Sequence, residues 1–160
     1  MIFYRSRRVG KGGKEFFMLK FRTLVNGSDK QVFSNEATYT RFGKFLRKHK
    51  LDEVPQIVNV LRGEMSLCGP RPEEARNIDV LPFDLREQIL SVKPGITSLS
   101  AIHFFDEERI LAESENISRD FWVKVKPMKI LLDIWYVQHK NWLIDLGLIL
   151  ATVKRIIFKH

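Results

Sequence analysis

The segment TRFGKFLRKHKLDEVPQIVNVLRGEMSLCGPRP, residues 40–72, places two adjacent carboxylates between a basic stretch and an arginine flanked by two prolines. In its first part, apolar and basic residues recur at helical spacing and fall largely on opposite sides of a short helix. The apolar positions are Tyr39, Phe42, Phe45 and Leu46, and the basic positions are Arg41, Lys44, Arg47 and Lys48. Positive charge therefore accumulates directly before Asp52 and Glu53.

The two carboxylates stand where a second helix is expected to begin. Asp52 has an N-cap side chain, and Pro55 is tolerated in a first helical turn. The apolar face of this helix would consist of Val54, Ile57, Val58 and Leu61. The free N–H groups and the dipole of a helix start keep a carboxylate ionised, as a nucleophile or metal ligand must be. Plain capping and first-turn charge explain the same pair equally well.

A stiff loop with one guanidinium follows the second helix. Gly63 is suited to end that helix, and residues 65–68 read as a short extended run. The prolines on both sides of Arg71 restrict the backbone of the next loop. A guanidinium matches the paired oxygens of a phosphate, so the segment as a whole predicts an anion-binding site.

The N-terminal residues predict a β-hairpin with arms at 2–9 and 15–24. The second arm alternates, which places Lys20 and Arg22 on one face, opposite the face of Phe17, Leu19 and Phe21. The Gly-rich turn at residues 10–13 fits no phosphate-binding loop, so a plain hairpin turn is expected there.

Composition indicates one globular domain in which the single Cys68 is a buried small hydrophobe. The chain has 160 residues, 44% of them hydrophobic and 11% aromatic, and a formal net charge of +8. One cysteine excludes an internal disulfide framework and suits a reducing cytoplasm. The charge predicts an anionic partner: a nucleic acid, a bilayer surface or a nucleotide-linked substrate. No signal peptide and no bilayer-spanning apolar run is present in the sequence.

Asp84 is expected to cap a short helix that ends near Leu90. Residues 92–97 resemble a turn, in which Lys93 offers a further anion contact. An acidic run at residues 106–108 suits a helix start better than a metal site. This run consists of Asp106, Glu107 and Glu108.

Two amphipathic helices are expected at the C-terminal end, one opened by Pro127 and one capped by Asn141. Core packing and an interfacial location at a membrane both explain their apolar stripes, since tryptophans and basic residues suit a headgroup boundary. The residues that suit this boundary are Trp122, Trp135, Trp142, Lys154, Arg155 and Lys159.

Nine ordered blocks spread over nearly the whole chain resemble the bacterial sugar transferases, the monotopic polyprenol-phosphate phosphoglycosyl transferases. They are KFRT (20–23), RFG (41–43), FLR (45–47), LDE (51–53), PQ (55–56), NV (59–60), GEMS (63–66), GPRP (69–72) and KPGIT (93–97). The resemblance and the patterns together predict a single α+β domain over residues 1–160, with an N-terminal β-hairpin packed on several helices and amphipathic C-terminal helices.

The resemblance implies an enzyme that moves a phosphosugar from a UDP-sugar to a polyprenyl (undecaprenyl) phosphate and releases UMP in glycoconjugate or exopolysaccharide biosynthesis. Asp52 would be the nucleophile that forms a covalent aspartyl intermediate, and Glu53 would bind Mg²⁺. The resemblance also suggests cationic substrate contacts. They are Lys20, Arg22, Arg41, Arg47, Arg71 and Lys93.

Members of this family carry a hydrophobic membrane-embedded helix before the segment that here begins at Ile2. No such helix stands in the sequence, which is therefore expected to be either a natural short form or a portion of a longer protein. The expected location is peripheral, on the cytoplasmic face of the bacterial inner membrane. Two other functions compete with the enzyme. A membrane-surface adaptor with a decayed site is disfavoured by the retained carboxylate pair, and a nucleic-acid-binding module is disfavoured because no recognised reader motif is present.

Overall fold

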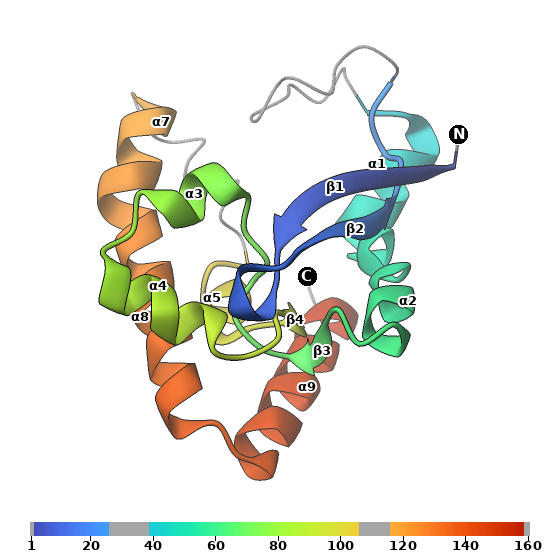
Figure 1. Cartoon of the computed structure of the whole chain (residues 1–160). Coiled ribbons are helices and arrows are strands. Elements are labelled where there is room, and N and C mark those ends of the chain that lie inside the picture. The colour runs from blue at the N-terminus through green and yellow to red at the C-terminus, as the bar shows by residue number, and fades with distance from the viewer. Residues whose placement is uncertain (1, 26–38, 106–115, 159–160) are drawn as a thin grey trace.

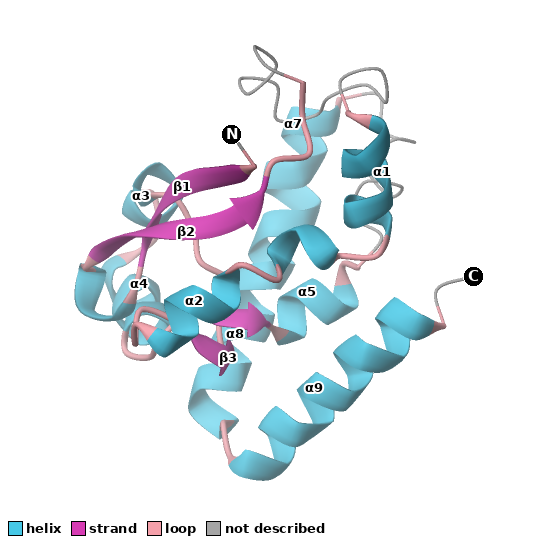
Figure 2. Cartoon of the chain, turned by 90° about the vertical axis from the view of Figure 1, so that its right-hand side faces the viewer, coloured by secondary structure: helices cyan, strands magenta, loops and turns pink. Residues whose placement is uncertain are grey.

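The computed structural model describes residues 2–25, 39–105 and 116–158. It confirms the α+β class: an antiparallel N-terminal hairpin lies beside α1 and above a group of short helices, and two long helices form the C-terminal part (Figures 1 and 2). The acidic helix start expected at residues 106–108 lies outside the described residues.

The hairpin forms as predicted. β1 (Phe3–Val9) pairs with β2 (Glu15–Phe21) across the short 3-10 turn η1 (Lys11–Gly13). Phe16 and Met18 point inward and pack against Met65 in one of the two buried clusters. Because side chains alternate along a strand, Lys20 continues this inward face.

α1 (Arg41–Lys48) is joined tightly to the end of the hairpin. The Thr40 hydroxyl caps the helix by accepting a hydrogen bond from the Gly43 N–H at 2.8 Å. A Cβ at Gly43 would lie only 2.2 Å from the Thr23 carbonyl oxygen, so the approach requires glycine. The apolar face of α1 is only partly covered, since Leu46 is buried whereas Phe42 is 69% exposed.

The start of the second helix differs from the sequence prediction. Asp52 does not cap it; it lies in the 3-10 turn η3 (Leu51–Glu53), which follows Lys50 in a left-handed conformation (φ 55°). α2 (Gln56–Leu61) begins only after Pro55.

The face that α2 buries is polar rather than apolar. Asn59 is fully buried; its side-chain oxygen accepts from the Leu19 N–H at 3.0 Å and its amide donates to the Phe17 carbonyl at 2.8 Å. The helix therefore attaches to β2 through hydrogen bonds. Ile57, Val58 and Leu61 remain exposed, with Leu61 at 82%, and only Val60 packs, partly buried, against the cluster of Phe16, Met18 and Met65.

A second, parallel sheet pairs β3 (Ser66–Cys68) with β4 (Gly95–Thr97). The prediction of a turn at residues 92–97 is therefore wrong for its second half, because backbone pairing with β3 extends the chain there. Between the strands lie α3 (Ala75–Asp79) and α4 (Phe83–Leu90). Asp84 occupies the first turn of α4 and makes no cap hydrogen bond, since the N-cap position is Pro82.

The C-terminal part consists of α5 (Leu99–His103), α7 (Ile117–Asp120), a π-helical turn η4 (Phe121–Val125), α8 (Lys126–His139) and α9 (Trp142–Ile157). Asn141 caps α9 as predicted, since its side-chain oxygen accepts from the N–H groups of Leu143 and Ile144 at 3.0 Å each.

α9 buries only part of its apolar surface. Leu148 packs with Cys68 and Tyr136 in the second buried cluster, which confirms that Cys68 is buried. Much of the remaining apolar surface of α9 is exposed, with Trp142 at 72% and Leu150 at 60%. None of the helices in the described ranges combines the length and the hydropathy needed to cross a bilayer.

Candidate active site

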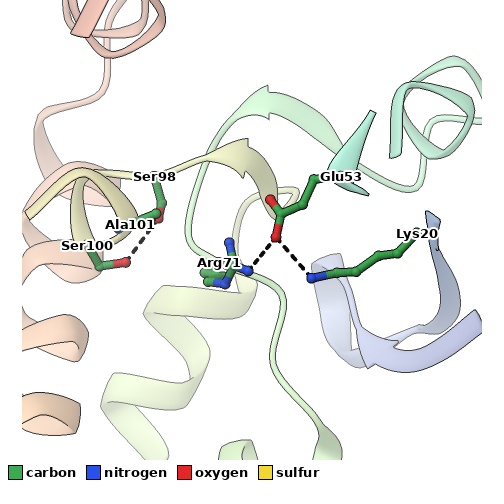
Figure 3. Close-up of polar contacts among 6 residues, drawn as sticks. All are labelled: Lys20, Glu53, Arg71, Ser98, Ser100 and Ala101. Atoms are coloured by element: carbon green, nitrogen blue, oxygen red, sulfur yellow. Dashed lines mark hydrogen bonds and ion pairs between the residues drawn. The ribbon is translucent and has the colours of Figure 1, made fainter. Parts of the chain in front are cut away.

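Three segments bring charged side chains together around Glu53. Lys20 on β2 places its Nζ 2.9 Å from Glu53 Oε1, and Arg71, in the loop after β3, places Nη2 2.7 Å from the same oxygen. Figure 3 shows the two cations converging on this carboxylate. Their side chains are 20% and 36% exposed, and that of Glu53 is 16% exposed, so the cluster is largely shielded from water.

The two cations determine the charge of Glu53. Burial by itself would raise its pKa, but Arg71 and Lys20 outweigh burial and hold the pKa of this carboxyl far below its usual range. Burial in turn lowers the pKa of Lys20, and the neighbouring Glu53 opposes this shift. Glu53 is therefore an anion across the whole physiological pH range.

Asp52 behaves in the opposite way. Burial raises its pKa, and the opposing charges of Lys20, Lys50 and Arg47 do not cancel this effect. Its Oδ1 is buried and receives no hydrogen bond from the described part of the chain. This differs from the expectation of an aspartate held ionised by a helix start, because Asp52 stands before α2 and outside its capping position.

The other arginines predicted to bind substrate are Arg47, Arg22 and Arg41, and they differ in their surroundings. The positive charge of Arg47 lowers the pKa of Asp52 and so opposes the effect of burial. The Arg47 guanidinium lies 4.8 Å from the centroid of the Tyr39 ring. Arg22 follows β2, where its N–H donates to the Ile2 carbonyl at 2.8 Å, and Arg41 is exposed in the first turn of α1.

Lys93 is placed elsewhere. It lines a polar pocket of about 260 Å³ whose lining includes neither Asp52 nor Glu53. The pocket also contains Lys11, Cys68, Tyr136 and Asp145, among others. Lys50, in contrast, lies close enough to Asp52 for its positive charge to lower the pKa of that carboxyl. Lys50 is not among the site residues expected from the sequence, although its position two residues before Asp52 could have indicated it.

The carboxylate pair fits a shared divalent cation better than a complete protein-built metal site. No group of three or more metal-ligating side chains occurs among residues 2–25, 39–105 and 116–158. Mg²⁺ is commonly held by one or two carboxylates together with substrate phosphates. The unpartnered Asp52 Oδ1 beside an ionised Glu53 provides such a donor set.

The site is thus a carboxylate pair on a tight turn with lysine and arginine supplied by the hairpin and the proline-flanked loop, and such cations suit the binding of phosphate oxygens. Comparison with known proteins identifies the family: the sequence model of the bacterial sugar transferases matches residues 1–159, and the chain belongs to that family. The resemblance found in the sequence is therefore confirmed.

Three relatives illustrate the similarity. The UDP-glucose:undecaprenyl-phosphate glucose-1-phosphate transferase of Xanthomonas campestris is 34% identical over 98% of this chain, which spans 31% of that protein. The uncharacterized sugar transferase EpsL of Bacillus subtilis is also 34% identical over 98% of the chain, which spans 70% of it. The exopolysaccharide production protein ExoY of Sinorhizobium fredii is 32% identical over 95% of the chain, which spans 68% of it.

Proposed function

We propose that this chain catalyses the transfer of a phosphosugar from a UDP-sugar to undecaprenyl phosphate, in the biosynthesis of a bacterial polysaccharide. Family membership and the names of the relatives support this substrate class. The observation that carries the proposal is that an ion-paired Glu53 stands next to a half-buried Asp52, whose buried Oδ1 has no donor among the described residues.

The proposed reaction has two displacements at the same phosphorus atom. An Asp52 oxygen attacks the sugar-bearing phosphorus of the donor, the phosphorus–oxygen bond to the leaving UMP breaks, and an aspartyl phosphosugar forms. An oxygen of the lipid phosphate then attacks that phosphorus, and the bond to Asp52 breaks. The products are UMP, a lipid diphosphosugar and the free carboxylate.

The surrounding cations reduce the repulsion between a carboxylate nucleophile and an anionic diphosphate. Arg71 and Lys20 form ion pairs with Glu53, and the charge of Arg47 favours the ionised form of Asp52. These three cations are therefore placed to bind phosphate oxygens as negative charge moves during the transfer. Arg22 and Arg41 are more peripheral donor contacts. Glu53, with Asp52, would hold Mg²⁺, which supplies further neutralisation of the diphosphate charge when bound.

The exposed apolar residues support a location at a membrane surface, where the lipid acceptor is present, and we propose that this surface is the cytoplasmic face. α9 presents Trp142, Leu146 and Leu150 to the outside and carries Lys154 and Arg155 in its last turn. Such a helix suits the boundary between acyl chains and anionic headgroups.

The first half-reaction gives a direct test. The protein is mixed in detergent with Mg²⁺ and a panel of UDP-sugars, and UMP release is followed together with the intact mass of the protein. We expect one sugar to release UMP and add a phosphosugar mass, which Asp52→Asn abolishes and which the exposed Asp84→Asn retains. Undecaprenyl phosphate should then remove the added mass. A folded protein that gains no mass with any sugar would favour the adaptor hypothesis.

A further inference from the structure

The loop that carries Arg71 is bonded through its backbone to a strand at each end. The Gly95 N–H of β4 donates to the Pro70 carbonyl at 2.9 Å, and the Val9 N–H of β1 donates to the Glu73 carbonyl, also at 2.9 Å. These two strands belong to different sheets. The position of Arg71 between them therefore depends on how firmly each end of the loop is held.

The Glu73 side chain binds the second end of the loop to two helices. Its Oε1 lies 2.6 Å from Nζ of Lys126 on α8, and its Oε2 accepts a hydrogen bond from the side-chain amide of Asn77 on α3 at 2.8 Å. Burial alone would raise the pKa of Glu73, but the charge and hydrogen bond of Lys126, together with the hydrogen bond of Asn77, outweigh burial and hold the pKa below its usual value. Both oxygens of an ionised carboxylate are thus bonded to donors.

Lys126 is an unusual partner because it is a charged residue inside the protein. Its side chain is only 4% exposed, and lysines are almost never fully buried unless they are paired. The π-helical turn η4 comes directly before it, and such a turn contains one more residue than an α-helical turn, which shifts the side chains that follow around the helix axis. In the described part of the chain, Glu73 is the only carboxylate that forms an ion pair with this buried ammonium.

The prolines on both sides of Arg71 transmit the position of the loop ends to the guanidinium. Pro70 and Pro72 each have a fixed φ angle, and Pro72 also restricts the backbone of Arg71 to extended conformations. The segment between the two anchors is therefore short and stiff, so that a movement of Glu73 displaces Arg71 as well. Arg71 Nη2 lies 2.7 Å from Glu53 Oε1, and a displacement of about 1 Å takes these atoms out of hydrogen-bond distance.

We propose that the Glu73–Lys126 ion pair positions Arg71: it fastens the second end of the proline-flanked loop to α8 and thereby holds the Arg71 guanidinium on Glu53. Among the described residues, no hydrogen bond or ion pair joins Glu73 or Lys126 to Asp52 or Glu53, so the two are positioning residues that act through Arg71. The positioning is independent of the proposed function, whereas its consequence for catalysis rests on that function.

Rotation of the Arg71 guanidinium about its Nε–Cζ bond, measured by NMR in the full chain without substrate, tests the positioning. A charge-assisted hydrogen bond slows this rotation. The double variant Glu73→Gln with Lys126→Met removes both charges and leaves neither one buried and unpaired, so its urea midpoint should stay close to that of the wild type. We expect rotation of Arg71 about tenfold faster in this variant, because the hydrogen bond to Glu53 is weakened while the protein stays folded.

Two further variants separate positioning from general effects. Tyr136→Phe is the matched control: it removes another buried hydrogen bond of α8, to Asp145 at 2.6 Å, and should leave Arg71 rotation unchanged. Asn77→Ala removes the second donor to Glu73 and keeps the ion pair, so rotation should become only about two- to threefold faster. Asn77→Ala replaces the double variant if that protein does not fold.

The rate of the first half-reaction provides the second readout. The double variant should slow adduct formation at saturating UDP-sugar by about tenfold or more, because a displaced Arg71 is poorly aligned in the transition state. The UDP-sugar concentration for half-saturation should change less, and Tyr136→Phe should stay within about threefold of the wild type in both quantities.

Unchanged Arg71 rotation in a folded double variant, or an equal increase in Tyr136→Phe, would overturn the proposal and leave the ion pair a contribution to general stability. Faster rotation with an undiminished rate of adduct formation would overturn its part in catalysis. If the wild type forms no adduct at all, the proposed function fails, and the rotation measurement alone still decides whether the ion pair positions Arg71.

Discussion

Replacing Glu53 with glutamine removes the anion that Lys20 and Arg71 share at a single oxygen. Breaking one partner out of a buried ion pair costs about 3–5 kcal/mol, because a buried charge remains uncompensated. Water reaches part of both cations here, so we expect a loss of about 2–3 kcal/mol in the free energy of unfolding. For a chain of this length, that corresponds to a melting temperature lowered by roughly 4–12 °C.

Urea and thermal unfolding at pH 7 measure this loss, with Glu15→Gln as the matched control. Glu15 pairs with Arg7 at 3.5 Å on the surface, with side chains 46% and 68% exposed, so its removal should cost less than about 0.5 kcal/mol. The double variant Lys20→Met with Glu53→Gln should recover part of the loss, since Lys20 then carries no charge to leave unpaired.

A Glu53→Gln protein as stable as the Glu15→Gln control, or more stable than the wild type, would contradict this expectation. Such a result would mean that the cations around Glu53 are hydrated well enough to need no anion. It would also mean that the carboxylate contributes strain rather than stability, as catalytic groups do in some enzymes.

Three further predictions concern stability. Lys126→Met leaves the Glu73 carboxylate without its ammonium partner and should lower the free energy of unfolding by about 3 kcal/mol in urea titrations. Asn141→Ala removes the cap of α9 and should cost about 1 kcal/mol, seen as a lower urea midpoint with an unchanged m-value. Burial raises the pKa of Asp133 to about 7 from an ordinary 3.8, so its stabilising contribution is complete below about pH 4 and is lost as pH rises to 7. The difference in unfolding free energy between the wild type and Asp133→Asn should therefore fall across this window, by on the order of 4 kcal/mol at about 1.4 kcal/mol per pKa unit.

Features that depend on neighbours in sequence were predictable. Period-two alternation around a glycine-rich turn predicted the hairpin, and the side chain of Asn141 predicted the start of α9. Both arise from interactions within a few residues, which a local pattern contains.

Features that depend on distant partners were not predictable in this way. Helical periodicity identified an apolar face on α2, but the helix is attached through Asn59 to a strand 40 residues earlier in the chain. The extended state of β4 likewise follows from pairing with β3, where Gly95 and Gly69 come so close that a Cβ on Gly95 would lie 2.2 Å from the Gly69 nitrogen. The sequence contains the glycine but not the partner that requires it.

The structure brings Lys20, Glu53 and Arg71 together, whereas Lys93 lines a different pocket. The roles that the resemblance implies for these residues stay predictions. The raised pKa of Asp52 follows mainly from desolvation, which depends on the whole packing around η3 and has no local sequence signal.

Burial raises the pKa of both Asp52 and Glu53, and the shifts end in opposite directions because the neighbouring cations outweigh burial only at Glu53. Lys20 and Arg71 bind one oxygen of Glu53 directly, whereas Arg47 acts on Asp52 and no described residue donates to Asp52 Oδ1. Adjacent acids whose environments separate their pKa values are suited to different roles. A permanently charged Glu53 suits the binding of a cation, and a more basic, unpartnered Asp52 oxygen suits attack on phosphorus. The division of labour that we propose therefore rests on contacts made from β2 and from the proline-flanked loop, not on the two acids alone.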